Sequence, residues 1–172
     1  MVIKIGTDCS GIEAPVQALK QMNIPYQHVW SCEIDKHAEK SILANYNPQK
    51  MYHDITKRKH ASLPDVDIYV CGFPCQPYSG AGQCMGWADP RSNVLHTLVK
   101  LTSLCRPDLV LLENVRNILK FGTVIRYIKE EFEALGYHVA WTEKDIGDFS
   151  PQVRSRVIFC ICLLYTSPSP RD

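Results

Sequence analysis

The chain has 172 residues, with 19 Lys and Arg against 18 Asp and Glu, 45% hydrophobic residues and 22% charged residues. This composition is typical of a globular protein, and it excludes a long disordered region or a collagen-like repeat. No apolar run approaches the roughly 18 residues of a membrane span. The formal net charge of +1 gives no general basic surface for nucleic acid, and the one dense basic run covers residues 57–60.

The eight cysteines lack the paired spacing of a zinc site, so no metal is expected. The N-terminus lacks the layout of a secretory signal, and reduced thiols are therefore expected. Most of the cysteines are interpreted as small buried hydrophobic residues.

Apolar runs alternate with helical patterns along the chain. Strands are predicted over residues 2–6, 27–32, 51–53, 66–71, 109–112, 137–143 and 156–162, and helices over 12–22, 35–46, 92–105 and 124–135. This order predicts an α/β fold with a mostly parallel sheet and helices on both of its faces.

Polar side chains follow the predicted strands, at the edge where such sheets bind ligands. Glu33 ends the second strand, about 20 residues past the first turn, where a carboxylate can bind both hydroxyls of a ribose. Asp54 could accept a hydrogen bond from an adenine amino group, with Ile34 and Ile55 flanking the ring. A cationic adenosine ligand therefore suits this edge, although each acid alone could equally be a helix cap or a solvated turn residue.

Cys75 lies in the loop of residues 72–80, between two prolines, whereas a structural cysteine normally lies inside a strand or helix. Proline fixes the backbone torsions of this loop. The loop is expected to expose the sulfur at the ligand edge of the sheet, which is a setting for a nucleophilic thiolate.

Glu113 ends a very apolar strand and is expected to be poorly solvated, so that it could keep a proton and donate it to a ring nitrogen. Arg154 and Arg156 alternate onto one face of a strand. They could pair with Glu113, or they could bind an anion or a pyrimidine carbonyl.

Six segments resemble, in order, the N-terminal catalytic part of DNA cytosine-5 methyltransferases that use S-adenosylmethionine (AdoMet). They are Asp8-Cys9-Ser10-Gly11, Cys32-Glu33-Ile34-Asp35, Asp54-Ile55, Phe73-Pro74-Cys75-Gln76, Glu113-Asn114-Val115 and Gln152-Val153-Arg154-Ser155-Arg156. The resemblance implies a Rossmann-like AdoMet-dependent methyltransferase fold over residues 1–160, cut short before the target-recognition region. Residues 161–172 are interpreted as the end of the last strand plus a suspected non-native tail.

The resemblance also implies a role for each segment. Cys75 would add to C6 of cytosine, Glu113 would hold its N3 and amino group, and Arg154 and Arg156 would support them. AdoMet would be bound by Asp8, Cys9, Ser10, Gly11, Glu33, Ile34, Asp54, Ile55 and Pro74. The flipped-out base and the DNA backbone would be contacted by Gln76, Ser79, Arg91, Asn114, Val115 and Gln152.

The expected function is methyl transfer from AdoMet to C5 of cytosine in double-stranded DNA, in restriction–modification, phage self-protection or regulation. A tRNA cytosine-5 methyltransferase of the same family and an inactive AdoMet- or nucleic-acid-binding fragment are the alternatives. Two positions depart from the family pattern: Cys9 replaces an aromatic residue, and Glu13-Ala14-Pro15 replaces glycines. A monomer without membrane association is expected, cytoplasmic in a prokaryotic or phage-type setting and nuclear in a eukaryote.

Overall fold

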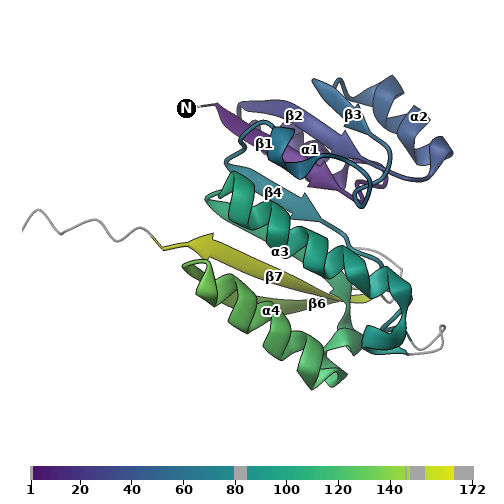
Figure 1. The fold of residues 1–172 in the computed structure, drawn as a ribbon. Coiled ribbons are helices and arrows are strands. Elements are labelled where there is room, and N and C mark those ends of the chain that lie inside the picture. The colour runs from purple at the N-terminus through teal and green to yellow at the C-terminus, as the bar shows by residue number, and fades with distance from the viewer. Residues whose placement is uncertain (1, 80–84, 146, 148–153, 165–172) are drawn as a thin grey trace, which may run out of the picture.

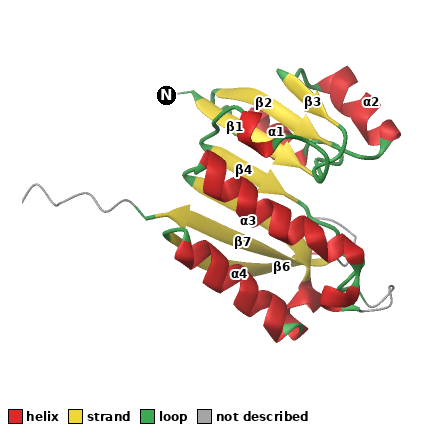
Figure 2. Cartoon of the chain, viewed as in Figure 1, coloured by secondary structure: helices red, strands yellow, loops and turns green. Residues whose placement is uncertain are grey.

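The computed structural model describes residues 2–79, 85–145, 147 and 154–164. The strands are β1 Ile3–Asp8, β2 Tyr26–Cys32, β3 Lys50–Tyr52, β4 Ile68–Cys71, β5 Leu109–Val115, β6 Tyr137–Asp145 and β7 Ser155–Leu163 (Figures 1 and 2). The α-helices are α1 Ala14–Gln21, α2 Lys36–Asn45, α3 Asn93–Cys105 and α4 Gly122–Ala134, and the short 3₁₀ helices are η1 His60–Ser62, η2 Gly86–Ala88, η3 Pro90–Ser92 and η4 Arg116–Lys120. Each predicted strand and helix is present, with its ends moved by a few residues.

One sheet runs through the molecule in the order β3-β2-β1-β4-β5-β7-β6. The five strands from β3 to β5 are parallel, and β7 runs antiparallel to both β5 and β6. The mostly parallel sheet is therefore confirmed. The strand order reverses between β1 and β4, and the carboxyl ends on either side of that point form the crevice in which such sheets bind ligands.

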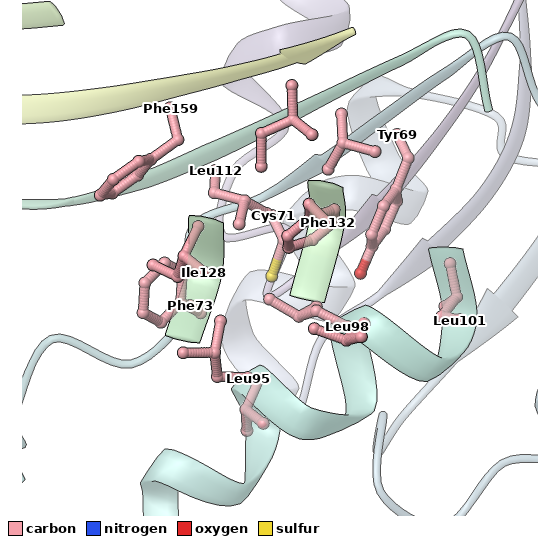
Figure 3. Packing of buried hydrophobic residues seen from close by; sticks show 14 of the residues in the cluster. Tyr69, Cys71, Phe73, Leu95, Leu98, Leu101, Leu112, Ile128, Phe132 and Phe159 are labelled. Carbon is pink, nitrogen blue, oxygen red and sulfur yellow. The ribbon is translucent and has the colours of Figure 1, made fainter. Parts of the chain in front are cut away.

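Helices cover both faces of the sheet, as predicted. Tyr69 and Cys71 of β4 belong to the larger hydrophobic core, which α3 and α4 close on one face. Figure 3 shows this packing, with Leu95, Leu98 and Leu101 of α3 and Ile128 and Phe132 of α4 around Cys71. Ile68 and Val70 point the other way, against the buried side chains of α1.

Helix α2 has an acidic N-cap, Asp35, which is the first residue of the helix predicted over 35–46. The Asp35 carboxylate accepts hydrogen bonds from the backbone N–H groups of His37 at 2.8 Å and Ala38 at 2.9 Å. These are donors that a helix start leaves without intrahelical partners. The cap fixes the backbone directly after the end of β2, where Glu33 lies.

Strand β5 extends past the predicted end at residue 112, through Glu113 and Asn114 to Val115. Its partner β7 pairs with it along this extension, Glu113 opposite Ile158 and Val115 opposite Arg156. The apolar run alone could not reveal this, because the extension depends on a strand that lies far along the chain. The extension places Asn114 in the core and Glu113 on the opposite face of the sheet.

The last strand continues to Leu163, and the Leu164 N–H donates to the Gly136 carbonyl at 3.0 Å. The remainder of the suspected tail, residues 165–172, lies outside the described residues. Within the described ranges, no helix has the length and apolar character that crossing a membrane requires.

Candidate active site

Three cavities meet around Gly72, directly after β4. The β2–β3 cavity has a volume of about 590 Å³ and lies beyond the ends of β2 and β3. The Cys75 cavity, of about 200 Å³, lies beside the loop of residues 72–76. The α1 cavity, of about 560 Å³, lies at the end of β1 and the start of α1. Both share Gly72 with the β2–β3 cavity. A Cβ atom on Gly72 would lie in van der Waals contact with both sides of the junction, 3.4 Å from Glu113 Oε2 and 3.8 Å from the Cys9 carbonyl oxygen.

Besides Gln76, seven of the residues that the resemblance assigns to AdoMet or DNA line the β2–β3 cavity. They are Cys9, Glu33, Ile34, Asp54, Ile55, Pro74 and Arg91. Gln76 lines both this cavity and the Cys75 cavity. Segments far apart in the sequence therefore meet at this cavity.

The two carboxylates of the β2–β3 cavity are held by local hydrogen bonds. Glu33 is 9% exposed, and its oxygens accept from the Gly11 N–H at 2.8 Å and the Asp35 N–H at 2.9 Å. The Asp54 carboxylate accepts from the Thr56 hydroxyl at 2.7 Å and N–H at 2.9 Å, and these bonds lower the pKa of Asp54. Each carboxylate oxygen has a second lone pair, so both side chains can accept further hydrogen bonds.

The Cys75 cavity brings the predicted nucleophile and the predicted acid together. Cys75, Glu113, Arg154 and Arg156 all line it, with Val115 beside them. Glu113 Oε1 lies 2.7 Å from Arg156 Nε. The expectation that Glu113 is poorly solvated is wrong, because its side chain is 43% exposed and ion-paired.

Two asparagines hold the loop that carries Cys75. Asn114, on the core face of β5, donates to the Phe73 carbonyl at 3.1 Å. Asn117 of η4 donates to the Tyr78 carbonyl at 2.6 Å. Asn114 was predicted to bind substrate, but its side chain is buried and bonded to the loop backbone. Asn117 was missed, because a lone asparagine after a strand gives no sequence signal for this contact.

Asp8, which was predicted to bind AdoMet, does not line the β2–β3 cavity; it lines the α1 cavity together with Glu113. It is fully buried and pairs with Arg58, and it also accepts a hydrogen bond from the Tyr69 hydroxyl at 2.6 Å. Burial, reinforced by the Asp8 charge, raises the pKa of Tyr69 well above its usual value, so this phenol remains a donor. Arg58 belongs to the dense basic run, yet its side chain is only 4% exposed and also lies over the Tyr52 ring. The run is therefore not a uniform basic surface.

The remaining predicted residues lie around these cavities. Ser10 is buried, and its hydroxyl oxygen accepts from the Cys32 N–H at 3.1 Å and lies 3.1 Å from the Cys32 carbonyl oxygen. Arg91 lies beside Asp89, with Nε 2.9 Å from Oδ1 and Nη2 2.5 Å from Oδ2. Ser79 is half-buried at the end of a described range, and Gln152 lies outside the described residues. Within the described part of the chain, no cluster of His, Cys, Asp and Glu could hold a metal ion.

A family model described as "C-5 cytosine-specific DNA methylase" matches residues 5–168. The chain belongs to this family. The Type II methyltransferase M.BsuFI of Bacillus subtilis is 37% identical over 133 residues, which cover 76% of this chain and 32% of the relative. M.NlaIV of Neisseria lactamica is 32% identical over 172 residues, covering 90% of this chain and 41% of the relative. The chain thus spans well under half the length of these two relatives.

Solved structures agree with the fold. The S. pombe Dnmt2 methyltransferase superposes with a TM-score of 0.77 at 22% identity, over 96% of this chain and 52% of its own. A putative DNA modification methyltransferase from an E. coli prophage superposes with a TM-score of 0.76 at 18% identity, over 94% of this chain and 47% of its own. The predicted fold class and family are both confirmed.

Proposed function

We propose that this chain carries the site that transfers a methyl group from AdoMet to C5 of cytosine in DNA. The observation that carries the proposal is the cavity shared by Cys75, Glu113 and Arg156, which joins the β2–β3 cavity at Gly72, Pro74 and Gln76. A nucleophile, an acid and its cationic partner thus adjoin a larger cavity that could hold the methyl donor.

The β2–β3 cavity suits AdoMet by its chemistry. Its two carboxylates, Glu33 and Asp54, complement a cationic ligand with ribose hydroxyls and an adenine amino group. Ile34 is 65% exposed at the cavity, and Ile55 is buried in its wall, so apolar surface is available to an adenine ring. When bound there, AdoMet supplies an electrophilic methyl group, for which C5 of cytosine is the acceptor.

The residues of the Cys75 cavity account for the activation of cytosine, whose C5 is a poor nucleophile. The Cys75 thiolate adds to C6, which forms an S–C6 bond and shifts electron density toward C5. Glu113, whose Oε1 lies 2.7 Å from Arg156 Nε and whose side chain is 43% exposed, accepts from the cytosine amino group and passes a proton taken from solvent to N3 as negative charge develops on the ring. Once C5 carries the methyl group, loss of the C5 proton breaks the S–C6 bond and regenerates the thiolate.

Duplex DNA is the proposed substrate, because the relatives above 30% identity are Type II methyltransferases. A base inside the helical stack cannot reach Cys75, so the cytosine must be flipped out.

The test uses a hybrid in which the C-terminal part of M.NlaIV follows residue 164. A duplex containing 5-fluorocytosine should trap a covalent adduct at Cys75, because fluorine cannot leave as a proton does. Cys75→Ser should abolish the adduct and methyl transfer, whereas Cys162→Ser, which changes an exposed thiol on β7, should leave both intact. An adduct at another residue, or undiminished turnover in Cys75→Ser, contradicts the mechanism. Preferential methylation of tRNA over duplex DNA contradicts the substrate.

The cofactor assignment is tested separately by calorimetry on the 172-residue chain. Glu33→Ala should weaken AdoMet binding, because it removes the proposed ribose acceptor. Glu133→Ala, an exposed acid on α4, is the matched control. Equal affinity in the two variants would contradict the assignment of Glu33.

A further inference from the structure

Glu13 has an unusual position for an acidic residue. It directly precedes α1 with φ 62° and ψ 45°, the left-handed region that disfavours residues with a Cβ atom. Its side chain is also fully buried. A buried carboxylate on a strained backbone persists only where its surroundings hold it firmly.

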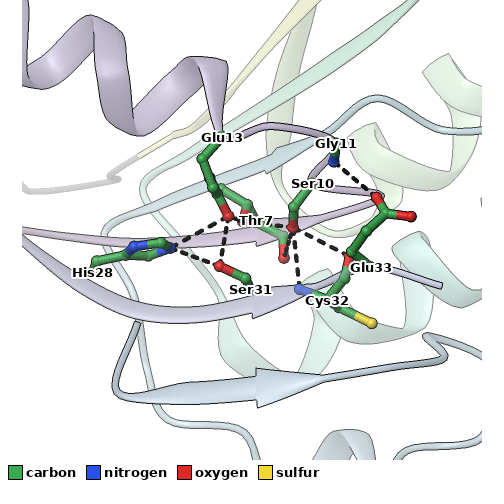
Figure 4. A network of polar contacts seen from close by, with 8 residues as sticks. All are labelled: Thr7, Ser10, Gly11, Glu13, His28, Ser31, Cys32 and Glu33. Carbon is green, nitrogen blue, oxygen red and sulfur yellow. Dashed lines mark hydrogen bonds and ion pairs between the residues drawn. The ribbon is translucent and has the colours of Figure 1, made fainter. Parts of the chain in front are cut away.

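The carboxylate is held by side chains from two neighbouring strands (Figure 4). Glu13 Oε1 accepts hydrogen bonds from the Thr7 hydroxyl of β1 at 2.6 Å and the Ser31 hydroxyl of β2 at 2.5 Å. His28 Nε2, also on β2, lies 3.4 Å from the same oxygen and 2.9 Å from the Ser31 hydroxyl. Glu13 thus joins the start of α1 to both strands.

The same network continues into the turn beside the β2–β3 cavity. The Thr7 hydroxyl lies 2.8 Å from the Ser10 hydroxyl. The next residue, Gly11, has φ 56° and donates its N–H to Glu33 Oε2 at 2.8 Å. The Glu13 N–H closes the turn by donating to the Ser10 carbonyl at 2.9 Å. Glu13 therefore acts on the cavity through Glu33 rather than by touching a ligand.

We infer that Glu13 is a positioning residue whose carboxylate fixes the Ser10–Gly11 turn, so that the Gly11 amide orients Glu33 toward the ribose of the cofactor. This inference rests on the proposed function, in which Glu33 binds the ribose. Glycine adopts the positive φ of such a turn without strain. At position 13, hydrogen bonds to the carboxylate hold a residue with a side chain in that conformation.

The test compares variants of the 172-residue chain by two measurements, hydrogen exchange of the Gly11 amide and calorimetric affinity for AdoMet. Glu13→Gly adopts the positive φ without strain, so backbone strain cannot cause a loss seen in this variant. We expect Gly11 exchange to accelerate, and the AdoMet Kd to rise, by about tenfold or more, the scale of a lost charge-assisted hydrogen bond. Glu13→Gln should largely restore both values, because its amide oxygen still accepts from Thr7 and Ser31.

Two further variants complete the design. Ser31→Ala removes one donor to the Glu13 carboxylate without changing the backbone, and it should produce a smaller change in the same direction. It serves as the test variant if Glu13→Gly fails to fold. Asn23→Gly relieves another positive φ, of 53°, beyond the far end of α1, and it should change neither measurement.

Unchanged Gly11 exchange in both Glu13→Gly and Ser31→Ala would overturn the inference. Equal acceleration at Gly11 and at core amides such as Val70 would also overturn it, since Glu13 would then support only global stability. If the unaltered chain does not bind AdoMet, the cofactor proposal fails, while Gly11 exchange still decides whether Glu13 holds the turn.

Discussion

Removing the guanidinium of Arg58 is expected to destabilise the fold severely, although Arg58 belongs to a run of charged residues. Arg58→Met keeps the aliphatic volume and leaves Asp8 as a buried carboxylate that retains its hydrogen bond from the Tyr69 hydroxyl. The two paired side chains are 4% and 0% exposed. Breaking a buried pair of this kind costs about 3–5 kcal/mol, because one charge remains uncompensated.

The exposed pair formed by Arg116 and Glu143 is the matched control. Its side chains are 65% and 44% exposed, so Arg116→Met should cost at most about 1 kcal/mol. Urea unfolding at neutral pH measures both values. For a chain of this size the Arg58 change corresponds to a fall in Tm of roughly 6–20 °C.

A double variant separates the charge effect from a loss of packing. Arg58→Met with Asp8→Asn leaves no unpaired charge and should recover part of the lost stability. If Arg58→Met costs no more than Arg116→Met, then Asp8 and Arg58 are not the buried pair described above.

Three further outcomes follow from the structure. Burial raises the pKa of the Cys32 thiol, so iodoacetamide should label half-buried Cys75 in the native chain but label Cys32 only after unfolding; native labelling of Cys32 would contradict its burial. Gly6→Ala places a Cβ atom 2.3 Å from the buried tryptophan ring on β2, so we expect a clear loss of stability in urea, and an unchanged midpoint would refute that packing. Hydrogen bonds lower the pKa of Asp145, and the largest contribution comes from a serine hydroxyl of β7. The ionised Asp145 therefore stabilises the fold at pH values above the ordinary pKa of aspartate, and this stabilisation is lost as pH falls through the lowered pKa. Asp145→Asn should therefore lower the urea midpoint at neutral pH but not near pH 2, and equal losses at both pH values would contradict this reading.

The elements were predictable because each leaves a local pattern in the chain. Alternating apolar runs and helical spacing located the strands and helices, and Asp35 marked the start of α2. The true end of β5 was not predictable, because Glu113 and Val115 join the strand only through pairing with β7. Local patterns thus give the elements, whereas distant pairing decides where some of them end.

The candidate site also has features that the sequence predicts and features that depend on contacts between distant residues. Motif residues identified the cavities, since Cys75 and Glu113 do line one space. The contacts that hold these residues in place could not be predicted from the sequence, because they join residues far apart in the chain. Arg58 lies in the dense basic run of residues 57–60, and only the need of a buried Asp8 for a cation could have suggested that its side chain is buried.

Gly72 lies where the cavity proposed for the methyl donor adjoins the cavity proposed for the cytosine. It is common to the linings of the three cavities, and even a single methyl group there would stand within contact distance of both Glu113 and the backbone of Cys9. A larger side chain would form a partition between the compartment proposed for AdoMet and the one proposed for the pyrimidine. Because residue 72 has no side chain, no side-chain atom of its own stands between the two proposed compartments.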